Sequence, residues 1–187
     1  MSEQLPQLHM RRKLERLPSL IVPPGYALRP LQPSDAAAWA ALLAQTGELG
    51  DWSLERAAPY FAPSGPMLLA GSYFLTHNGA PIATAQLHLH HDDEYAPIPE
   101  LGWVAVSRAQ RGRGLGYIVS LAVLHYAASA GHRDVFLRTD DHRLPAISTY
   151  LKLGFQPWLR DASAPPRWDR VLQAIGKAAS ASSSHAG

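Results

Sequence analysis

The fold of this chain is decided by the stretch Arg111-Gly112-Arg113-Gly114-Leu115-Gly116, which joins an apolar strand pattern to a long apolar helix pattern. Its alternating glycines let the backbone turn tightly and let a ligand approach the main chain. The first amides of the following helix have no intrahelical partner, and with the positive end of the helix dipole they favour an anion. Arg108, Arg111 and Arg113 add charge suited to pairing with phosphates. The stretch therefore predicts a phosphate-binding loop.

Two better-known phosphate motifs do not fit this stretch. A dinucleotide-binding fingerprint has the pattern G-x-G-x-x-G, which counted from Gly112 needs a glycine at position 117, where the chain has Tyr117. A Walker A loop ends in Gly-Lys-Ser or Gly-Lys-Thr, and neither tripeptide occurs in the chain. A Rossmann dinucleotide site and a P-loop nucleotide hydrolase are therefore excluded.

Two further stretches flank the loop. Upstream, Glu100-Leu101-Gly102-Trp103-Val104-Ala105-Val106 has the pattern of a strand, and downstream Leu144–Phe155 contains A-x-x-x-Y-x-x-x-G-F. The loop itself meets the pattern Gln/Arg-x-x-Gly-x-Gly/Ala through Arg111, Gly114 and Gly116. With these two patterns in this order, the chain resembles the GNAT acetyltransferases, whose motif A corresponds to the loop and whose motif B corresponds to the downstream stretch. The resemblance covers about residues 26–158.

This resemblance implies a fold and an activity. The fold class is α+β, a single-domain GNAT-like acyl-CoA N-acyltransferase fold with a mixed, mostly antiparallel sheet flanked by helices. The co-substrate is acetyl-CoA, and the reaction is direct transfer of the acetyl group from the coenzyme thioester to a primary amine of an unidentified acceptor, which is either a small molecule or a peptide. The alternative is a catalytically silent acyl-CoA-binding module that has kept the coenzyme pocket.

Composition is consistent with such an enzyme. The chain has 187 residues, 47% of them hydrophobic and 17% charged, which suits one globular domain. Cysteine is absent, so neither a disulfide, a thiolate metal site nor a cysteine nucleophile is available. The sequence shows no membrane-length apolar stretch and no signal-peptide core, which predicts a cytoplasmic protein without a membrane partner. A net charge of +2 with scattered basic residues, and only two Arg-Gly units, argues against nucleic acid as a partner.

The ends of the chain differ from its middle. Residues 1–24 read as an N-terminal arm, in which the cluster Arg11-Arg12-Lys13 and nearby leucines dock on the domain or on a partner subunit, or form a surface helix. Residues 25–173 are predicted to form the acetyltransferase domain. The Ala/Ser-rich residues 174–187 are predicted to be disordered. The basic arm and the family resemblance favour a homodimer.

Between the ends the pattern alternates between strands and helices. Asn78-Gly79 is a strong hairpin signal. Ser34-Asp35 is predicted to cap the first helix, Pro59 to end the second, Gly131 to follow the helix after the loop, and Gly154 to close the last helix. The expected strands are 26–31, 69–77, 81–89, 100–106 and 135–137 with a last one after Gly154, and the expected helices are 34–43, 54–58, 115–130 and 144–153.

Acetyl transfer to an ammonium needs a base, polarisation of the carbonyl, and a proton for the leaving thiolate. Glu100 is the predicted base, because it shares one strand face with Gly102 and Val104 and because the resemblance places a base on this strand. Its other interpretation is a solvated carboxylate in an ion pair. The resemblance makes Tyr150 the acid that protonates the coenzyme sulfur; alternatively its ring packs in the core and its hydroxyl only makes a hydrogen bond.

The coenzyme-binding residues follow from the same resemblance. Main-chain amides of the strand, Val104 or Val106, polarise the carbonyl. The pyrophosphate lies on the amides of the loop. The family commonly has an asparagine just before motif B, and this chain has Asp140-Asp141-His142-Arg143 there, which leaves the pantetheine contact unassigned. The predicted cofactor-binding set is Val104, Ala105, Val106, Arg111, Gly112, Arg113, Gly114, Leu115 and Gly116.

A histidine-rich stretch precedes the central strand. His88 and His90 project from one strand face, and Asp92, Asp93 and Glu94 follow, an arrangement that suggests a metal site. Spacing fixes no third ligand and no HExxH motif is present, so the prediction is no metal. Instead, His88 and His90 are predicted to line the acceptor site, where an imidazole can act as base in place of Glu100. The acidic residues would attract a cationic amine, or simply form a solvated turn.

Overall fold

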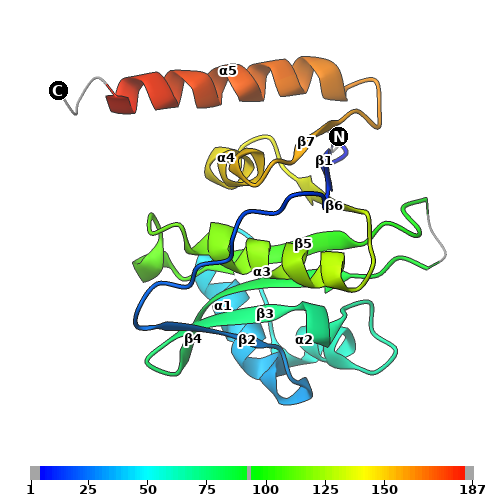
Figure 1. The fold of residues 1–187 in the computed structure, drawn as a ribbon, viewed down its shortest axis with the longest axis vertical. Helices are drawn as coiled ribbons and strands as arrows, with labels where there is room; N and C mark the ends of the chain where they lie inside the picture. Colours follow the sequence, from blue (N-terminus) through cyan, green and yellow to red (C-terminus); the bar gives the residue numbers. More distant parts are fainter. Residues whose placement is uncertain (1–4, 92–93, 184–187) are drawn as a thin grey trace. The chain divides into compact units, whose positions relative to one another are not determined.

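The computed structural model describes residues 5–91 and 94–183, with side chains as far as residue 178. It divides into two compact units (Figure 1). The larger unit is Lys13–Val135, and the smaller one combines the N-terminal residues to Arg12 with the chain from Phe136 onward. The loop and Glu100 belong to the larger unit, while Tyr150 belongs to the smaller one. In the described part of the chain, no helix is both long and apolar enough to cross a membrane.

The larger unit is built on four strands in the order β2-β3-β4-β5, and all their pairings are antiparallel. Asn78 and Gly79 have φ values of 52° and 79° and connect two of these strands as a tight hairpin. Left-handed values at both turn residues are what a two-residue hairpin requires, so the predicted hairpin is confirmed. The strands are β2 (Tyr26–Pro30), β3 (Tyr73–His77), β4 (Ala80–His88) and β5 (Glu100–Val106).

Helices pack on both faces of this sheet. Phe74 and Leu75 are adjacent on β3 and both fully buried, and since neighbouring strand residues point to opposite faces, each face is covered. Figure 1 shows α3 in front of the strands and α1 behind them. The chain here forms α1 (Ala36–Thr46), α2 (Leu54–Phe61) and α3 (Leu115–Ser129), with single 3₁₀ turns at Pro33–Asp35, Leu69–Gly71 and Arg108–Gln110.

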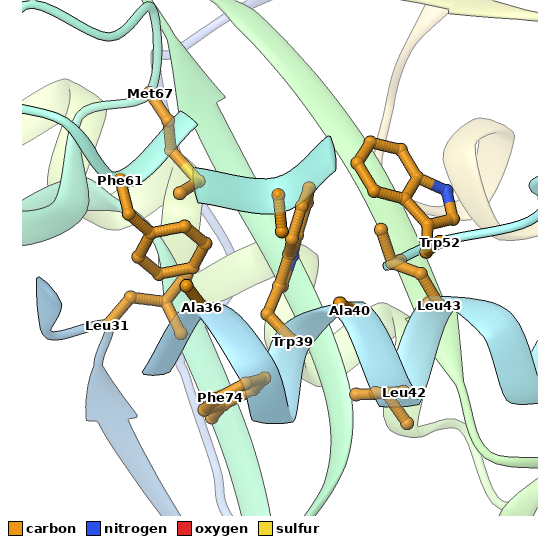
Figure 2. Packing of buried hydrophobic residues seen from close by; sticks show 12 residues of the cluster. Leu31, Ala36, Trp39, Ala40, Leu42, Leu43, Trp52, Phe61, Met67 and Phe74 are labelled. Carbon is orange, nitrogen blue, oxygen red and sulfur yellow. The ribbon is translucent and has the colours of Figure 1, made fainter. Parts of the chain in front are cut away.

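The core on the α1 side is aromatic. In Figure 2, Trp39 of α1 lies near the middle of the picture, with Phe61 and Met67 on one side of it and Trp52 on the other. Trp39 and Phe74 are completely buried. Burial of large apolar side chains of this kind contributes about 1.5–3 kcal/mol each. The cluster therefore holds α1 and α2 firmly against β3 and β5.

The smaller unit contains three strands in the order β6-β1-β7. β1 pairs with β7 in antiparallel register, with His9 opposite Trp158. Pro145 lies in the first turn of α4, and Gly154 follows that helix with a φ of 85°, both as predicted. The elements are β1 (Leu8–Lys13), β6 (Asp134–Thr139), α4 (Leu144–Lys152), β7 (Gln156–Trp158) and α5 (Ala164–Ser183).

Several local predictions differ from the structure. The basic cluster Arg11-Arg12-Lys13 lies in strand β1 and not in a surface helix. Helix α2 continues past Pro59 to Phe61, because its packing holds the last turn that proline weakens. Helix α5 reaches Ser183, although disorder was predicted from residue 174, because alanine strongly favours a helix. Residues 184–187 of that tail lie outside the described residues.

Asp35 also has a different role from the predicted one. Its side chain does not cap α1 but accepts from Arg29 Nη1 at 2.6 Å and from the Gln32 amide at 2.8 Å. The Arg29 hydrogen bond lowers the pKa of Asp35, against the effect of burial. α1 then runs to Thr46, where Gly47 ends it with a φ of 67°. Through its hydrogen bond with Arg29 of β2, Asp35 thus fixes the backbone that leads into α1.

Candidate active site

Strand β5 carries a β-bulge at its centre. Gly102 lies opposite Gln86 and Ala105 lies opposite Thr84, so two residues of β5, Trp103 and Val104, occupy the space of one on β4. Trp103 has a φ of 45°, which is unusual for a residue with a side chain. A bulge takes its extra residue out of the ladder of backbone hydrogen bonds and bends the strand. Of the two amides predicted to polarise a carbonyl, that of Val104 is therefore at the bulge, whereas Val106 pairs with Ala83.

A buried glutamine supports the bulge. Gln86 on β4 is fully buried. With its amide oriented to satisfy both neighbours, its oxygen accepts from Trp39 Nε1 and its nitrogen donates to the Gly102 carbonyl at 3.3 Å. Buried polar groups of this kind are costly unless paired, so the bonds define one arrangement. They connect α1 to the strand segment just before Trp103.

The glycine loop has the backbone predicted for it. Gly112 and Gly114 have φ values of 77° and 73°, and a Cβ built on either would have no atom within 4 Å. These glycines are thus required by backbone conformation and not by crowding. Gly114 precedes the first turn of α3 and provides no side-chain cap. The amides of Leu115 and Gly116, at the start of the helix, precede the first intrahelical donors.

Protein groups already hold the side chains of this loop. Arg108 and Arg111 both donate to the carbonyl of Thr46 at the end of α1, with Nη2 to oxygen distances of 3.3 Å. Arg111 Nη1 also donates to Glu48 Oε1 at 2.9 Å. On the other side, Arg113 Nη1 donates to the Tyr26 hydroxyl at 3.3 Å. The arginines predicted to meet phosphate therefore also anchor the loop to α1 and β2.

At the start of β5, Glu100 lies against His90. The Nε2 atom of His90 is 3.0 Å from Glu100 Oε2. Both side chains are largely buried, with 15% of His90 and 9% of Glu100 exposed. The His90 ring also lies 5.5 Å from the Tyr95 ring, centre to centre. The predicted base and one of the two predicted acceptor-site histidines are thus brought together.

His88 is buried in a different setting. It lies opposite Glu100 in the β4–β5 ladder, and its ring covers Gly102, where a Cβ would come within 3.3 Å of it. The centre of its ring also lies 6.0 Å from that of the Tyr60 ring. Among the side chains described in residues 5–91 and 94–178, no three of His, Asp or Glu are grouped to hold a metal ion. Asp92 and Asp93 of the predicted acidic stretch lie outside the described residues.

The bulge also brings an aromatic residue into contact with α2. The Trp103 ring lies 4.8 Å from the Trp52 ring and 6.0 Å from the Tyr60 ring. Tyr60 in turn contacts His88, so a continuous line of rings leads from the α1–α2 region to the start of β5. Sequence reasoning missed this cluster, as well as Tyr26 and Glu48, because no local pattern marks contacts between segments so far apart in the chain.

In the smaller unit, Tyr150 lies on α4 and is buried. Its ring packs edge-on against Phe155 at 6.1 Å. Burial raises the pKa of Tyr150 to about 12, although the charge of Arg143 acts in the opposite direction. The phenol is therefore protonated throughout the neutral range.

The segment before α4 is fixed by an arginine. Arg167 on α5 donates to both carboxylate oxygens of Asp141, with Nε to Oδ2 at 2.9 Å, and to the carbonyl of Pro6 at 2.8 Å. This hydrogen bonding lowers the pKa of Asp141. Asp141 belongs to the stretch Asp140–Arg143, in which the resemblance leads one to expect an asparagine, and in this chain it binds the protein's own arginine.

The larger unit thus combines a four-stranded antiparallel sheet, a bulged last strand and a glycine loop at a helix start. The sequence matches the Acetyltransferase (GNAT) family over residues 38–155. The chain therefore belongs to the GNAT acetyltransferase family, whose co-substrate is acetyl-CoA. The predicted family and the α+β fold class are confirmed.

Curated relatives of the chain include mycothiol acetyltransferases. That of Nocardia farcinica is 35% identical over 165 residues, which cover 79% of this chain and 52% of the relative. That of Thermomonospora curvata is 33% identical over 174 residues, covering 85% of this chain and 55% of the relative. The chain thus spans about half the length of the curated relatives it matches.

Solved structures show the same fold. A GCN5-related N-acetyltransferase from Sphaerobacter thermophilus superposes with a TM-score of 0.61 at 19% identity, covering 82% of this chain and 50% of that one. An aminoglycoside N-acetyltransferase in complex with CoA superposes with a TM-score of 0.58 at 19% identity, covering 73% of this chain and 92% of that one.

Proposed function

We propose that this chain transfers an acetyl group from acetyl-CoA to the primary amine of a small-molecule acceptor. The observation that carries the proposal is one continuous strand–loop–helix segment in the larger unit. Its strand, β5, begins at the Glu100–His90 pair, is bulged at Trp103 and leads to the glycine loop at the start of α3. This order provides a proton acceptor, displaced backbone amides and a phosphate cradle along a single path.

The coenzyme would lie along that path. The loop amides from Arg111 to Gly116 would hold the pyrophosphate, supported by the left-handed glycines and the start of α3. Val104, at the bulge, is the better candidate for polarising the acetyl carbonyl, because Val106 lies within the ladder. Ala105 and Val106 would line the path between them. The anchored arginines would then hold the loop in shape around the phosphates.

The proton transfers follow from the remaining groups. The acceptor ammonium gives one proton to the Glu100–His90 pair, and its lone pair forms the new N–C bond. As the C–S bond breaks, the thiolate gains a proton from Tyr150, and the second proton lost by the nitrogen restores the Tyr150 phenol by way of solvent. The proton held by the Glu100–His90 pair passes to solvent, so one proton is released per turnover. The Tyr150 phenol, whose pKa burial raises to about 12, is protonated at neutral pH and so has a proton to give.

The names of the relatives bear mainly on the identity of the acceptor. The curated relatives carry the name mycothiol acetyltransferase. That name refers to a small molecule and not to a protein. A small-molecule amine is therefore proposed here, with the acceptor of the mycothiol acetyltransferases as the first one to assay.

The test has two stages. A thermal-shift titration with acetyl-CoA, CoA and NAD should raise Tm with the two CoA species alone, since a ligand that binds only the folded state stabilises it. Release of CoA thiol is then measured with a panel of primary amines that includes the acceptor of the mycothiol acetyltransferases, ethylamine, glucosamine, kanamycin and an alanyl peptide. A shift without turnover on any amine would support the silent acyl-CoA-binding module, and no shift with CoA would refute the proposal.

A glycine substitution separates coenzyme binding from stability. Gly114→Val should lower the affinity for CoA at least 10-fold, because a side chain at a φ of 73° costs about 1–2 kcal/mol and reshapes the loop. Gly131→Val is the matched control, since Gly131 has a φ of 87° and equally open surroundings beyond the other end of α3. Both variants should melt at lower temperature. If Gly114→Val binds CoA as tightly as Gly131→Val by calorimetry, the loop is not the coenzyme site.

A further inference from the structure

We infer that His90 is the group that takes the proton from the acceptor, and that Glu100 is the residue that positions it. This inference rests on the proposed function, because it concerns the base of the same reaction. It reassigns the role that the family resemblance gives to Glu100. The starting observation is the 3.0 Å contact between His90 Nε2 and Glu100 Oε2.

The contact fixes the protonation of the imidazole. An ionised carboxylate only accepts hydrogen bonds, so the His90 Nε2 atom that meets it must carry the hydrogen. In neutral imidazole the lone pair then lies on Nδ1, which becomes the basic atom. A carboxylate that orients a histidine in this way also stabilises the imidazolium that forms when Nδ1 takes a proton.

Basicity favours the histidine over the glutamate. A general base works best when its pKa lies near the working pH. An imidazole is intrinsically a stronger base than a carboxylate. An acceptor ammonium transfers its proton more readily to the stronger base of the two. The Glu100 carboxylate, hydrogen-bonded to His90, is suited to compensate the charge that results.

The neighbouring groups distinguish His90 from His88. The His90 ring is held between the Glu100 carboxylate and the ring of Tyr95. The His88 ring is packed over Gly102 and against Tyr60, which places it among packing residues. His91, directly after His90, is exposed. The same short segment therefore offers one candidate base and one exposed control.

The first test measures the protonation of the pair without any acceptor. Long-range ¹H–¹⁵N spectra of histidine-labelled protein should show His90 with its hydrogen on Nε2 in the wild type. In Glu100→Gln the His90 signals should change to a mixture of both tautomers. A wild-type His90 with its hydrogen on Nδ1 would overturn the inference. Because no turnover is needed, this result stands even if the proposed function fails.

The second test uses amines of different basicity. Ethylamine is protonated at neutral pH, whereas 2,2,2-trifluoroethylamine is largely unprotonated and needs no base to become a nucleophile. His90→Ala should lower kcat/KM for ethylamine about 100-fold and for trifluoroethylamine less than about 5-fold. Added imidazole should raise the kcat/KM of His90→Ala for ethylamine about 10-fold. His91→Ala should stay within about 2-fold of wild type.

Two outcomes would contradict the assignment. If His90→Ala keeps its ethylamine rate while Glu100→Gln loses about 100-fold, the glutamate itself is the base. If kcat/KM of His90→Ala falls by the same factor with both amines and added imidazole does not raise it, the histidine has a structural role only. Absence of wild-type turnover on every amine of the panel would refute the proposed function instead, which the tautomer spectra distinguish from a wrong assignment of the pair.

Discussion

Replacing Tyr150 by Phe is expected to lower kcat about 100-fold, the lower end of what a positioned proton donor contributes. The ring that packs against Phe155 remains in this variant, so the fold and the affinity for CoA should be retained. Only the hydroxyl, whose pKa burial raises to about 12, is removed. The leaving thiolate would then have to take its proton from water. The measurement is steady-state release of CoA thiol, with the most active acceptor of the panel, alongside calorimetric binding of CoA.

The control is another tyrosine whose hydroxyl has no proposed role. Tyr126 lies on α3, where its ring contacts Gly71, and Tyr126→Phe should retain wild-type kcat. Equal rates for Tyr150→Phe and wild type would place Tyr150 among residues that only pack in the core. A loss of CoA affinity together with kcat would instead indicate that the hydroxyl helps to bind the coenzyme.

Replacing Asp141 by Asn should cost about 3 kcal/mol in the free energy of unfolding, because it leaves the guanidinium of Arg167 without its anion. Only 5% of the Arg167 side chain is exposed, so water cannot easily replace the carboxylate. Arg167→Met should cost less, about 1–2 kcal/mol, because 39% of the Asp141 side chain is exposed and its charge can hydrate. Denaturant unfolding at pH 7 measures the free energy of unfolding of both variants.

The neighbouring aspartate provides the matched control. Asp140 pairs with Arg143 at 2.9 Å, but 25% of that arginine side chain is exposed, so Asp140→Asn should cost less than about 1 kcal/mol. If Asp140→Asn and Asp141→Asn lower the free energy of unfolding equally, the burial of Arg167 is not the source of the stabilisation by the Asp141–Arg167 pair.

The Asp141 contribution should also depend on pH. The pKa of Asp141 is lowered in the folded protein, chiefly by its hydrogen bonds to Arg167. Its stabilisation is therefore complete above the pKa of an unfolded aspartate, about 3.9, and is lost as the pH falls through the lower folded value. The stability difference between wild type and Asp141→Asn should accordingly shrink below about pH 4. A difference that stays constant from pH 7 to pH 3 would show that the charge is not its source.

Much of the fold could be predicted because its signals are local. Asn78-Gly79 permits the left-handed turn that a two-residue hairpin needs, and the hairpin is present. The strand Glu100–Val106 has the predicted bounds, and α3 starts directly after the glycine loop. In each case the conformation depends on residues within a few positions of one another. The family motifs have the same property, which is why two of them identified the family.

The predictions that failed concern segments whose state depends on distant partners. For the N-terminal basic cluster, the sequence leaves both a docked arm and a surface helix open, and only the helix is contradicted, because β7, almost the whole chain away, supplies a strand partner. Helix α2 continues beyond Pro59, where Phe61 is buried in the aromatic core. Neither partner is visible in the local pattern, since propensity is only a weak preference that tertiary packing overrides.

The sequence by itself determined the strand–loop–helix segment, its glycine conformations and the family, because backbone preferences act between neighbours in the chain. Only the tertiary structure decided how the chemistry is arranged around that segment. It brought His90 to Glu100, turned Arg108 and Arg111 toward the end of α1, and matched Asp141 with Arg167. The reason is physical: such bonds form only where folding brings distant segments together and excludes water, so no local pattern encodes them.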